Sequence, residues 1–364
     1  MNKQSAEATA RQEAGGSEAR MSAFVLRGAK LLDPVALLIP RPGDGEVLVR
    51  VRRAGICGSD VHYFSHGRAG RFVPKRPFVL GHEFAGDVAA LGDGVSDALL
   101  GRRVAVDPSI PCGACSTCRS GRYNLCSDMR FFGSASCDPH LDGGFAQFVV
   151  APAANCHLLD ERLSWGEAAL VEPLSVVLHA LARGGGVAGK SVLITGGGAI
   201  GQLLALSSRA YGAAQIVLSD PAEFARAQAL GMGADHTLDP MRAGFSGEAE
   251  ELSRGGFDVM FEAAGSAAAL VSGMAMLRRG ATLVQVGTLP SEVTLPFNDI
   301  MARELTVYGS FRFANVFDTA LQMMAAGRIP AGKVISAVYP LSDLPAAMDR
   351  AVEKTDVIKV QVEP

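Results

Sequence analysis

Four cysteines, Cys112, Cys115, Cys118 and Cys126, stand in the segment PCGACSTCRSGRYNLC with the spacing C-x2-C-x2-C-x7-C. A compact set of thiolates on one loop is what a closed, tetrahedral structural zinc site needs. Two disulfides or four unrelated thiols are the alternatives. Disulfides require an oxidising compartment, and we expect none, because the N-terminal residues lack the apolar core of a signal peptide. The spacing therefore predicts a structural zinc site.

A second group of potential metal ligands lies upstream. Cys57 stands in GICGSDVHYF, His82 follows 25 residues later in VLGHEF, and Glu83 comes next. One thiolate, one imidazole and one carboxylate form an incomplete shell, which distinguishes a catalytic zinc from a structural one. Taken singly, these residues are better explained as a buried thiol, a core histidine and a surface acid. Their place beside a four-cysteine loop favours a catalytic metal and hence an enzyme.

A glycine-rich turn in the middle third predicts a dinucleotide site. Gly196, Gly198 and Gly201 form a G-x-G-x-x-G after the apolar run SVLIT, and Asp220 follows 24 residues after Gly196. The glycines would give a tight turn, room for the pyrophosphate and close helix–strand packing, while the acid would bind the ribose. A carboxylate favours NAD, although the nearby Arg226 could turn toward the extra phosphate of NADP. A glycine-rich turn with a solvated aspartate is the alternative.

Composition bounds the class of protein. The 364 residues are enough for two domains, and 48% of them are apolar. A net charge of −3 gives no basic footprint for nucleic acid or an anionic membrane. No uncharged apolar run reaches the ~18 residues that a membrane span needs. We therefore expect a protein that acts on a small molecule, without a nucleic-acid or membrane partner.

Two kinds of element must position these groups. Residues 1–21 are polar and predict a disordered extension. The N-terminal third then carries short alternating runs, such as EVLVRVRR over 46–53, which predict a mainly β region with the metal motifs on its turns. From about residue 166, apolar runs alternate with helical stretches, which predicts a doubly wound α/β domain around a parallel sheet.

The combined motifs resemble the zinc-dependent medium-chain dehydrogenase/reductase family over residues 22–364. VEPLSVVLHA around Glu172 is similar to the polyol dehydrogenase branch, and DMRFFGSA, PHLDGGF and GSFRF are similar to L-idonate 5-dehydrogenases. The resemblance implies a GroES-like, mainly β catalytic domain from residues 22–165 and 312–364. It also implies a Rossmann dinucleotide-binding domain over 166–311, inserted between the two catalytic segments.

The same resemblance assigns residues to the catalytic metal. It implies that Cys57 and His82 bind zinc and that Glu83, Glu172 or water completes the shell, a choice that the sequence leaves open. Asp60 matches the acid that orients a zinc-bound histidine, with an Asx turn as its alternative.

A proton relay and a hydride acceptor complete the expected chemistry. Ser59 and His62 are spaced like the relay of relatives, and an imidazole suits proton exchange near neutral pH. A loop histidine bonded to the backbone is the alternative for His62. Zinc would lower the pKa of a secondary hydroxyl, and the nicotinamide would accept the hydride. Four residues are therefore predicted to be catalytic: Ser59, His62, Glu83 and Glu172.

The resemblance also implies a substrate-binding residue. Arg312 in GSFRF matches a substrate-contacting arginine, and its planar fork suits a carboxylate. Tyr63, Phe132 and the neighbouring Phe131 are expected to line the pocket, with core packing as the alternative. Arg130 is a second candidate, with a solvated face as its alternative. The predicted cofactor-binding residues are Gly196, Gly198, Ile200, Gly201, Asp220, Val286 and Gly287.

These residues lead to an expectation of function. We expect a cytoplasmic NAD-dependent dehydrogenase with one catalytic and one structural zinc, which oxidises L-idonate to 5-keto-D-gluconate reversibly. An enzyme that acts on sorbitol or xylitol is the alternative, and a non-catalytic NAD-binding sensor is a third hypothesis. A homotetramer or homodimer is expected, because related dehydrogenases pair through edge strands.

Overall fold

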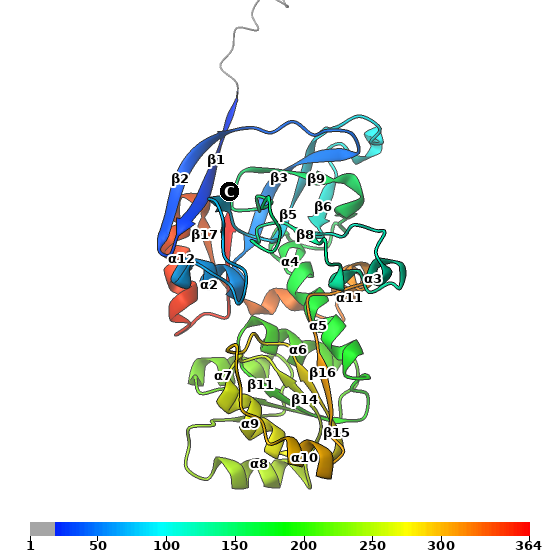
Figure 1. Cartoon of the computed structure of the whole chain (residues 1–364), viewed down its shortest axis with the longest axis vertical. Helices are drawn as coiled ribbons and strands as arrows, with labels where there is room; N and C mark the ends of the chain where they lie inside the picture. The colour runs from blue at the N-terminus through cyan, green and yellow to red at the C-terminus, as the bar shows by residue number, and fades with distance from the viewer. Residues whose placement is uncertain (1–18) are drawn as a thin grey trace, which may run out of the picture.

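The computed structural model describes residues 19–364 and has two parts that join at the middle of the molecule (Figure 1). The upper part in this view holds the N-terminal third and the C-terminal residues, and the lower part holds the segment between them. Residues 1–18, most of the predicted N-terminal extension, lie outside the described residues. The first strand begins at Arg20, so the last two residues of that predicted extension belong to a strand.

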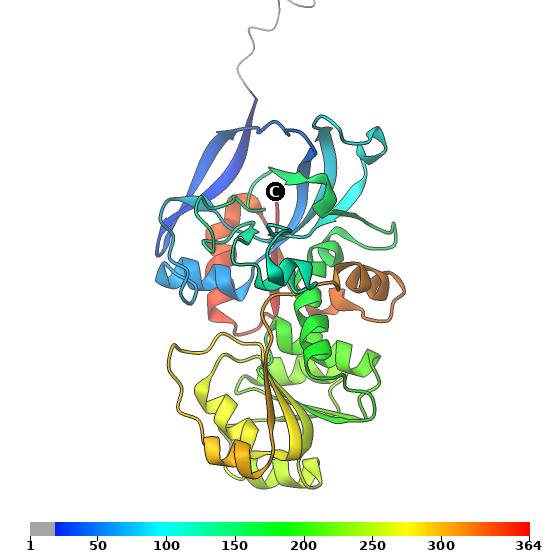
Figure 2. The same ribbon diagram turned by 45° about the vertical axis from the view of Figure 1, so that its right-hand side comes forward.

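A seven-stranded, mostly antiparallel sheet forms the centre of the upper part. In pairing order its strands are β10 (Cys156–Leu158), β6 (Arg103–Val106), β5 (Glu83–Leu91), β3 (Glu46–Gly55), β18 (Lys359–Glu363) and β17 (Ile335–Pro340), with β9 (Phe148–Pro152) on β3. The strand predicted over 46–53 is present as β3. Because β18 lies between β3 and β17, the end of the chain completes a sheet that begins near its start (Figure 2).

Two smaller sheets complete the upper part. One is three-stranded, in the order β2 (Leu31–Leu38), β1 (Arg20–Gly28) and β4 (Phe78–Val79), and the other pairs β7 (Ser109–Ile110) with β8 (Arg130–Phe131). The connection between β7 and β8 carries all four cysteines of the spaced motif. We call residues 112–126 the four-cysteine lobe.

A six-stranded parallel sheet forms the lower part. In pairing order its strands are β13 (His236–Leu238), β12 (Gln215–Ser219), β11 (Ser191–Thr195), β14 (Phe257–Glu262), β15 (Leu277–Gln285) and β16 (Thr306–Gly309). Val192, Leu193 and Ile194 are all buried, as expected for a strand covered on both faces. The order is 3-2-1-4-5-6, which places a ligand crevice at the carboxyl ends of β11 and β14. The predicted doubly wound α/β domain is confirmed.

Helices cover both faces of the parallel sheet and join the two parts. Among residues 19–364, no helix is both long and apolar enough to cross a membrane. The α-helices are α2 (Gly58–His66), α3 (Ser116–Arg119), α4 (Trp165–Ala169), α5 (Val171–Arg183), α6 (Ala199–Ala210), α7 (Glu223–Gly231), α8 (Phe245–Ser253), α9 (Ala267–Ala275), α10 (Phe297–Ala302), α11 (Phe317–Ala325) and α12 (Leu344–Glu353). The 3-10 helices are η1 (Asp97–Leu99), η2 (Tyr123–Leu125), η3 (Ala153–Asn155), η4 (Ala331–Val334) and η5 (Leu341–Asp343).

Helix α5 connects the two parts, as Figure 1 shows. Its buried apolar side chains share one hydrophobic core with β11, α6 and α11, and Ala85 and Ala105 of the upper sheet reach the same core. The segment from Phe313 to Val334 therefore packs on α5, where the two parts join, and the chain after it returns to the upper sheet (Figure 1). The predicted domain boundaries at 165/166 and 311/312 stay a prediction.

Candidate functional site

The candidate catalytic metal site lies where β3 and β5 meet α2. Cys57 stands at the N-terminus of α2, two residues after the end of β3, and His82 stands directly before β5, whose first residue is Glu83. The antiparallel pairing of the two strands places Gly55 opposite Glu83. Ligand atoms of Cys57, His82 and Glu83 all lie within 4.8 Å of one another. The fold thus brings Cys57 close to the adjacent pair His82 and Glu83, which follow 25 residues later in the chain.

Asp60 links Cys57 to His82 from inside α2. Its side chain is buried, its Oδ2 accepts a hydrogen bond from the Cys57 N–H at 2.9 Å, and its Oδ1 lies 3.8 Å from His82 Nδ1. Burial raises the pKa of Asp60, while the nearby His82 acts to lower it. One carboxylate oxygen therefore holds the helix turn, and the other faces the imidazole.

Lys359, which sequence reasoning missed, is a buried cation beside the candidate metal ligands. Its Nζ forms an ion pair with Glu83 Oε2 and donates to the Ile56 carbonyl at 2.9 Å. Burial opposes the charge of Lys359, but Glu83 and Cys57 raise its pKa. A Cβ on Gly55 would lie 2.1 Å from Glu83 Oε2, so only glycine leaves room for this pair. The signal in the sequence was a lysine inside the apolar strand KVQV.

The donor set fits zinc. Thiolate, imidazole and carboxylate are all zinc ligands, and three protein ligands leave a position open for a substrate. Burial, with Glu83 beside it, raises the pKa of the Cys57 thiol to about 12, so a bound cation is needed to hold it as a thiolate. Two buried atoms of the site, His82 Nδ1 and Asp60 Oδ1, have no hydrogen-bond partner within the described part of the chain. Buried polar atoms without a partner are expected where a bound metal would change the positions of the side chains that carry them.

Glu172 lies beside this group rather than inside it. It is buried in the first turn of α5, and its carboxylate is not among the three ligand atoms that cluster within 4.8 Å. Burial raises its pKa to about 8, with Glu83 and Cys57 adding to the rise and His82 opposing it. Its place as a metal ligand therefore stays a prediction.

The predicted relay residues lie on α2. Ser59 and His62 are three positions apart, so they share one face of the helix. Ser59 hydrogen-bonds with Cys57 and tends to lower the pKa of that thiol. Partial burial lowers the pKa of His62, and His66 and Lys354 add to the effect. A neutral imidazole near the surface suits a group that passes protons to water.

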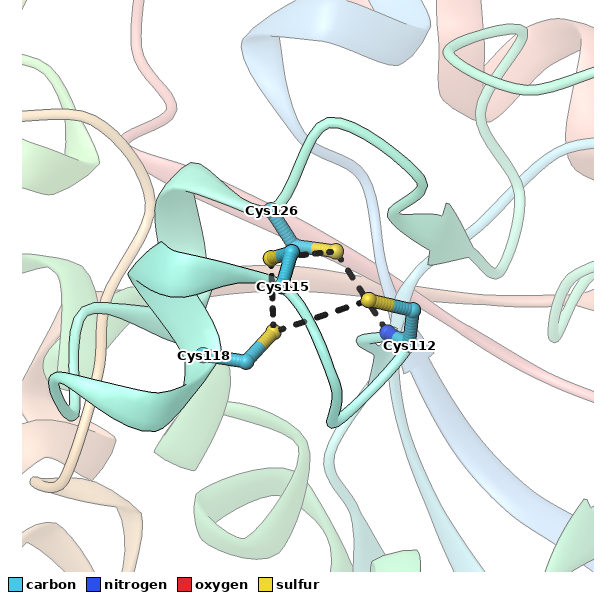
Figure 3. Close-up of side chains that lie close together, drawn as sticks. All are labelled: Cys112, Cys115, Cys118 and Cys126. Atoms are coloured by element: carbon cyan, nitrogen blue, oxygen red, sulfur yellow. Dashed lines mark hydrogen bonds between the residues drawn. The ribbon is translucent and has the colours of Figure 1, made fainter.

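The four-cysteine lobe forms a second compact group (Figure 3). The Sγ atoms of Cys115 and Cys118 are 3.4 Å apart, those of Cys115 and Cys126 3.9 Å, and those of Cys112 and Cys118 4.0 Å. Four thiolates around one zinc at 2.3 Å would be separated by about 3.8 Å, and a disulfide would need about 2.05 Å. The spacing therefore fits a tetrahedral zinc and not a pair of disulfides.

The glycine-rich turn lies between β11 and α6. Gly196 has φ +97°, and a Cβ there would lie 2.5 Å from Ala264 N. A Cβ on Gly201 would lie 1.8 Å from Gly196 O, which shows how tightly the helix packs on the turn. A Cβ on Gly198, at the N-terminus of α6, would meet nothing within 4 Å. That open space, at the end of a helix dipole, suits a pyrophosphate.

Asp220 lies beside this turn, at the end of β12. Its carboxylate accepts hydrogen bonds from Gly197 N at 2.6 Å and Ala222 N at 2.8 Å. Arg226 donates to the carbonyls of Asp220 and Pro221 and forms an ion pair with Asp239 at 3.3 Å. Its guanidinium is therefore engaged inside the protein.

Glu262, a second residue that sequence reasoning missed, supports the remaining cofactor candidates. It is buried at the end of β14, where its carbonyl accepts hydrogen bonds from the N–H groups of Val286 and Gly287, at 2.9 and 2.8 Å. Its carboxylate accepts from Ala264 N at 3.0 Å. The predicted Ile200 packs against the central core. An acid at the end of the apolar run DVMFE was the available signal.

The aromatic substrate candidates are buried. Tyr63 accepts a hydrogen bond from Ala135 N at 3.0 Å, and Phe132 makes an edge contact with Phe84 at 5.8 Å. Both belong to the core of the upper part, so the core alternative accounts for their burial, and their substrate role stays a prediction. Arg130 is exposed. Arg312 differs, because its guanidinium lies 3.9 Å from the ring centre of Phe131, and that ring lies 5.6 Å from His82.

Comparison with known proteins agrees with these two parts. A family profile described as "Alcohol dehydrogenase GroES-like domain" matches residues 43–161, and one described as "Zinc-binding dehydrogenase" matches residues 199–326. The sorbitol dehydrogenase of Bacillus subtilis (strain 168) is 37% identical over 94% of this chain and 97% of its own length.

Solved structures give the same result. L-idonate 5-dehydrogenase from Escherichia coli K-12 has a TM-score of 0.89 and 36% identity, covering 95% of this chain and 99% of that one. A zinc-binding dehydrogenase from Sinorhizobium meliloti 1021, bound to NADP, has a TM-score of 0.87 and 35% identity, covering 95% and 100%. The chain therefore belongs to the zinc-dependent medium-chain dehydrogenase/reductase family, in its polyol dehydrogenase branch.

Proposed function

We propose that this protein is an NAD-dependent zinc dehydrogenase that oxidises a secondary hydroxyl of a sugar acid, with L-idonate giving 5-keto-D-gluconate in a reversible reaction. The observation that carries the sugar-acid assignment is the guanidinium of Arg312, which lies beside the candidate metal site and has no carboxylate partner in the described part of the chain. The E. coli L-idonate 5-dehydrogenase is a similar protein and supports the same substrate.

The surroundings of Arg312 leave room for an anion. Its Nη2 donates to Ser136 Oγ at 2.9 Å, and its planar face stacks on Phe131. Within residues 19–364, no carboxylate lies within ion-pair distance of it. Burial lowers its pKa to about 10, while the nearby Glu172 acts to raise it. A substrate carboxylate would supply the bidentate partner that this guanidinium lacks.

The proposed reaction divides the work among the residues of the site. A zinc ion held by Cys57, His82 and Glu83 would lower the pKa of the substrate hydroxyl. Ser59 and His62 would pass the released proton to water. Arg312 would fix the sugar acid by its carboxylate, so that one secondary carbon faces the nicotinamide. The four cysteines would hold a second, structural zinc.

NAD is the proposed cofactor. Asp220 stands where a ribose 2′-hydroxyl would be bound, and a 2′-phosphate there would meet a carboxylate. The engaged Arg226 adds support, since it would have to leave Asp239 to reach such a phosphate. NADP remains the alternative, because the S. meliloti structure contains it.

A neutral polyol is the competing substrate. The B. subtilis sorbitol dehydrogenase is as similar to this chain as the L-idonate enzyme, and Arg312 already bonds a neutral hydroxyl, that of Ser136. A non-catalytic NAD sensor is disfavoured, because it would not need the open ligand set, Ser59 and His62 together.

A homodimer or homotetramer in the cytoplasm is also part of the proposal. In the described residues, β16 pairs with β15 alone and leaves its other edge open. Val307 and Tyr308 on that strand are exposed, as are Phe297 and Met301 of α10, each 71% exposed. An open strand edge with apolar neighbours favours pairing with a second copy.

A substrate panel tests the proposal. The zinc-loaded enzyme is assayed with NAD and L-idonate, sorbitol or xylitol, and NADH is followed by its absorbance. We expect the highest kcat/KM with L-idonate. If sorbitol or xylitol gives an equal or higher kcat/KM, the sugar-acid assignment is wrong and the polyol alternative holds.

A further inference from the structure

The short segment 311–315, between β16 and α11, holds Arg312 in an unusual backbone conformation. Arg312 and Asn315 have φ values of 52° and 61°. This left-handed region is unfavourable for a residue with a Cβ atom, although asparagine tolerates it better than arginine does. Such a conformation persists where neighbouring groups hold it in place.

The neighbouring groups belong to the four-cysteine lobe. Asn124 Nδ2 donates to the Phe311 carbonyl at 2.9 Å, on one side of Arg312. On the other side, the Asn315 N–H donates to the Tyr123 hydroxyl at 2.7 Å, and Asn315 Nδ2 donates to the Gly121 carbonyl at 2.8 Å. Three hydrogen bonds thus fasten the chain before and after Arg312 to the stretch between Cys118 and Cys126.

The lobe also supports the side chain of Arg312, through Phe131 of β8. The Arg312 guanidinium lies over the Phe131 ring, and Phe131 packs with Met129 and with Cys126 of the lobe in a small apolar cluster. Cys115 and Cys118 pack against the same cluster. The backbone and the guanidinium of Arg312 are therefore both held by elements that the four cysteines organise.

We propose that the four-cysteine lobe positions Arg312 for the substrate, with Tyr123, Asn124 and Asn315 as the positioning residues. The lobe then contributes to substrate selection as well as to stability, because it fixes the guanidinium at the distance and angle that the substrate anion needs. This inference rests on the proposed function only for the identity of the substrate group, a carboxylate. The positioning of Arg312 applies to any substrate group that it binds.

The variant Tyr123→Phe tests the proposal, since it removes only the hydroxyl that accepts from Asn315. We expect the KM for L-idonate to rise about three- to tenfold, the scale of one neutral hydrogen bond, with kcat changed by less than about twofold. The Kd of L-idonate for the enzyme–NADH complex, in which no hydride transfer is possible, should rise by the same factor. The zinc content and the Tm should stay as in the wild type.

A second variant and a matched control separate positioning from a general effect. Asn315→Gly adopts the same φ without strain and loses only the bond to Gly121, so it should raise the same KM. Tyr211→Phe, a tyrosine at the exposed end of α6 that makes no side-chain hydrogen bond in the described structure, should change neither KM nor kcat.

A double-mutant cycle with Arg312→Ala decides the outcome. If the lobe acts through Arg312, the effect of Tyr123→Phe on KM should disappear in the Arg312→Ala background. An undiminished effect there, or an unchanged KM in both single variants, overturns the proposal. If the wild type prefers sorbitol, the proposed function fails, and the cycle is run with sorbitol: coupling supports the positioning role, and its absence overturns it.

Discussion

Lys359 and Asp60 show how single buried charges are arranged around the candidate metal ligands. Each would be unfavourable alone in this interior, because a buried charge needs a partner. Lys359 is paired with Glu83, and Asp60 is tied to the backbone of Cys57 while facing His82. Lys359 and Asp60 therefore orient the three candidate ligand residues without occupying the position that a metal and a substrate would take.

The replacement Cys57→Ser should empty the catalytic metal site and abolish turnover, because a hydroxyl is a poor substitute for a thiolate on zinc. Metal analysis should fall from about two zinc ions per chain to about one. NADH binding, followed by fluorescence, should be retained. Cys156→Ala, which removes a buried cysteine outside both groups, should keep both ions. Turnover near the wild-type level in Cys57→Ser would rule out this site.

Asp220 is the residue that should set the choice of dinucleotide. Its replacement by Ser should weaken NAD binding by about 1–3 kcal/mol, the scale of a charge-assisted hydrogen bond. It should also reduce the preference of the enzyme for NAD over NADP. Part of this loss would come from the turn, because Asp220 also accepts from Gly197 N. Titrations of both dinucleotides measure it. Unchanged affinities for NAD and NADP would show that Asp220 does not bind the ribose.

At the scale of the elements, helix α2 and the four-cysteine lobe position the residues of the candidate site. Helix α2 and its N-cap carry Cys57, Ser59, Asp60 and His62. The four-cysteine lobe is connected to the rest of the protein by β7 and β8, which are only two residues long and cannot fix its conformation by themselves. A loop this irregular needs a cross-link to keep one shape, and four thiolates on one ion would supply it.

Cys115→Ser should therefore act mainly on stability. We expect a loss of about 3 kcal/mol or more, since a structural metal contributes directly to folding. Thermal unfolding of the variant should occur at a clearly lower temperature than that of the wild type. A normal Tm with only turnover lost would contradict the division between a structural and a catalytic ion.

The pH profile of oxidation tests the role of α2. His62 must be neutral to accept a proton, and its pKa is lowered by burial and by His66. The acid limb of kcat should therefore lie below the ordinary histidine value of about 6.5. His62→Ala should remove this limb and lower kcat by about 10²-fold. His66→Ala should shift the limb to higher pH instead, because a neighbouring positive charge is lost. An identical limb in all three proteins would exclude His62 from the relay.

At the scale of the whole molecule, sequence patterns predicted those features that depend on residues close together in the chain. The strand over 46–53, the alternation of strands and helices after residue 166, the cysteine spacing and the glycine-rich turn depend on residues close together in the chain, and each is present in the structure. The upper sheet built from both ends of the chain is non-local, and only the family resemblance implied it. Lys359 was missed because its partner Glu83 is 276 positions away (359 − 83), and only the insertion of β18 beside β3 joins them. The fastening of Asn315 to Tyr123 is non-local in the same way.

At the scale of the whole molecule, Arg312 is proposed to bind the substrate carboxylate. Its guanidinium lies over Phe131, whose ring neighbours His82, and it has no carboxylate partner among residues 19–364. The most direct test compares kcat/KM for L-idonate and for sorbitol in the wild type, Arg312→Ala and Arg312→Lys. Leaving a substrate carboxylate unpaired should cost about 2–5 kcal/mol, whereas a neutral hydroxyl loses about 0.5–1.5 kcal/mol. Arg312→Ala should therefore lower kcat/KM far more for L-idonate than for sorbitol, and Arg312→Lys should recover part of the loss. Equal losses for the two substrates would contradict a carboxylate bound by Arg312.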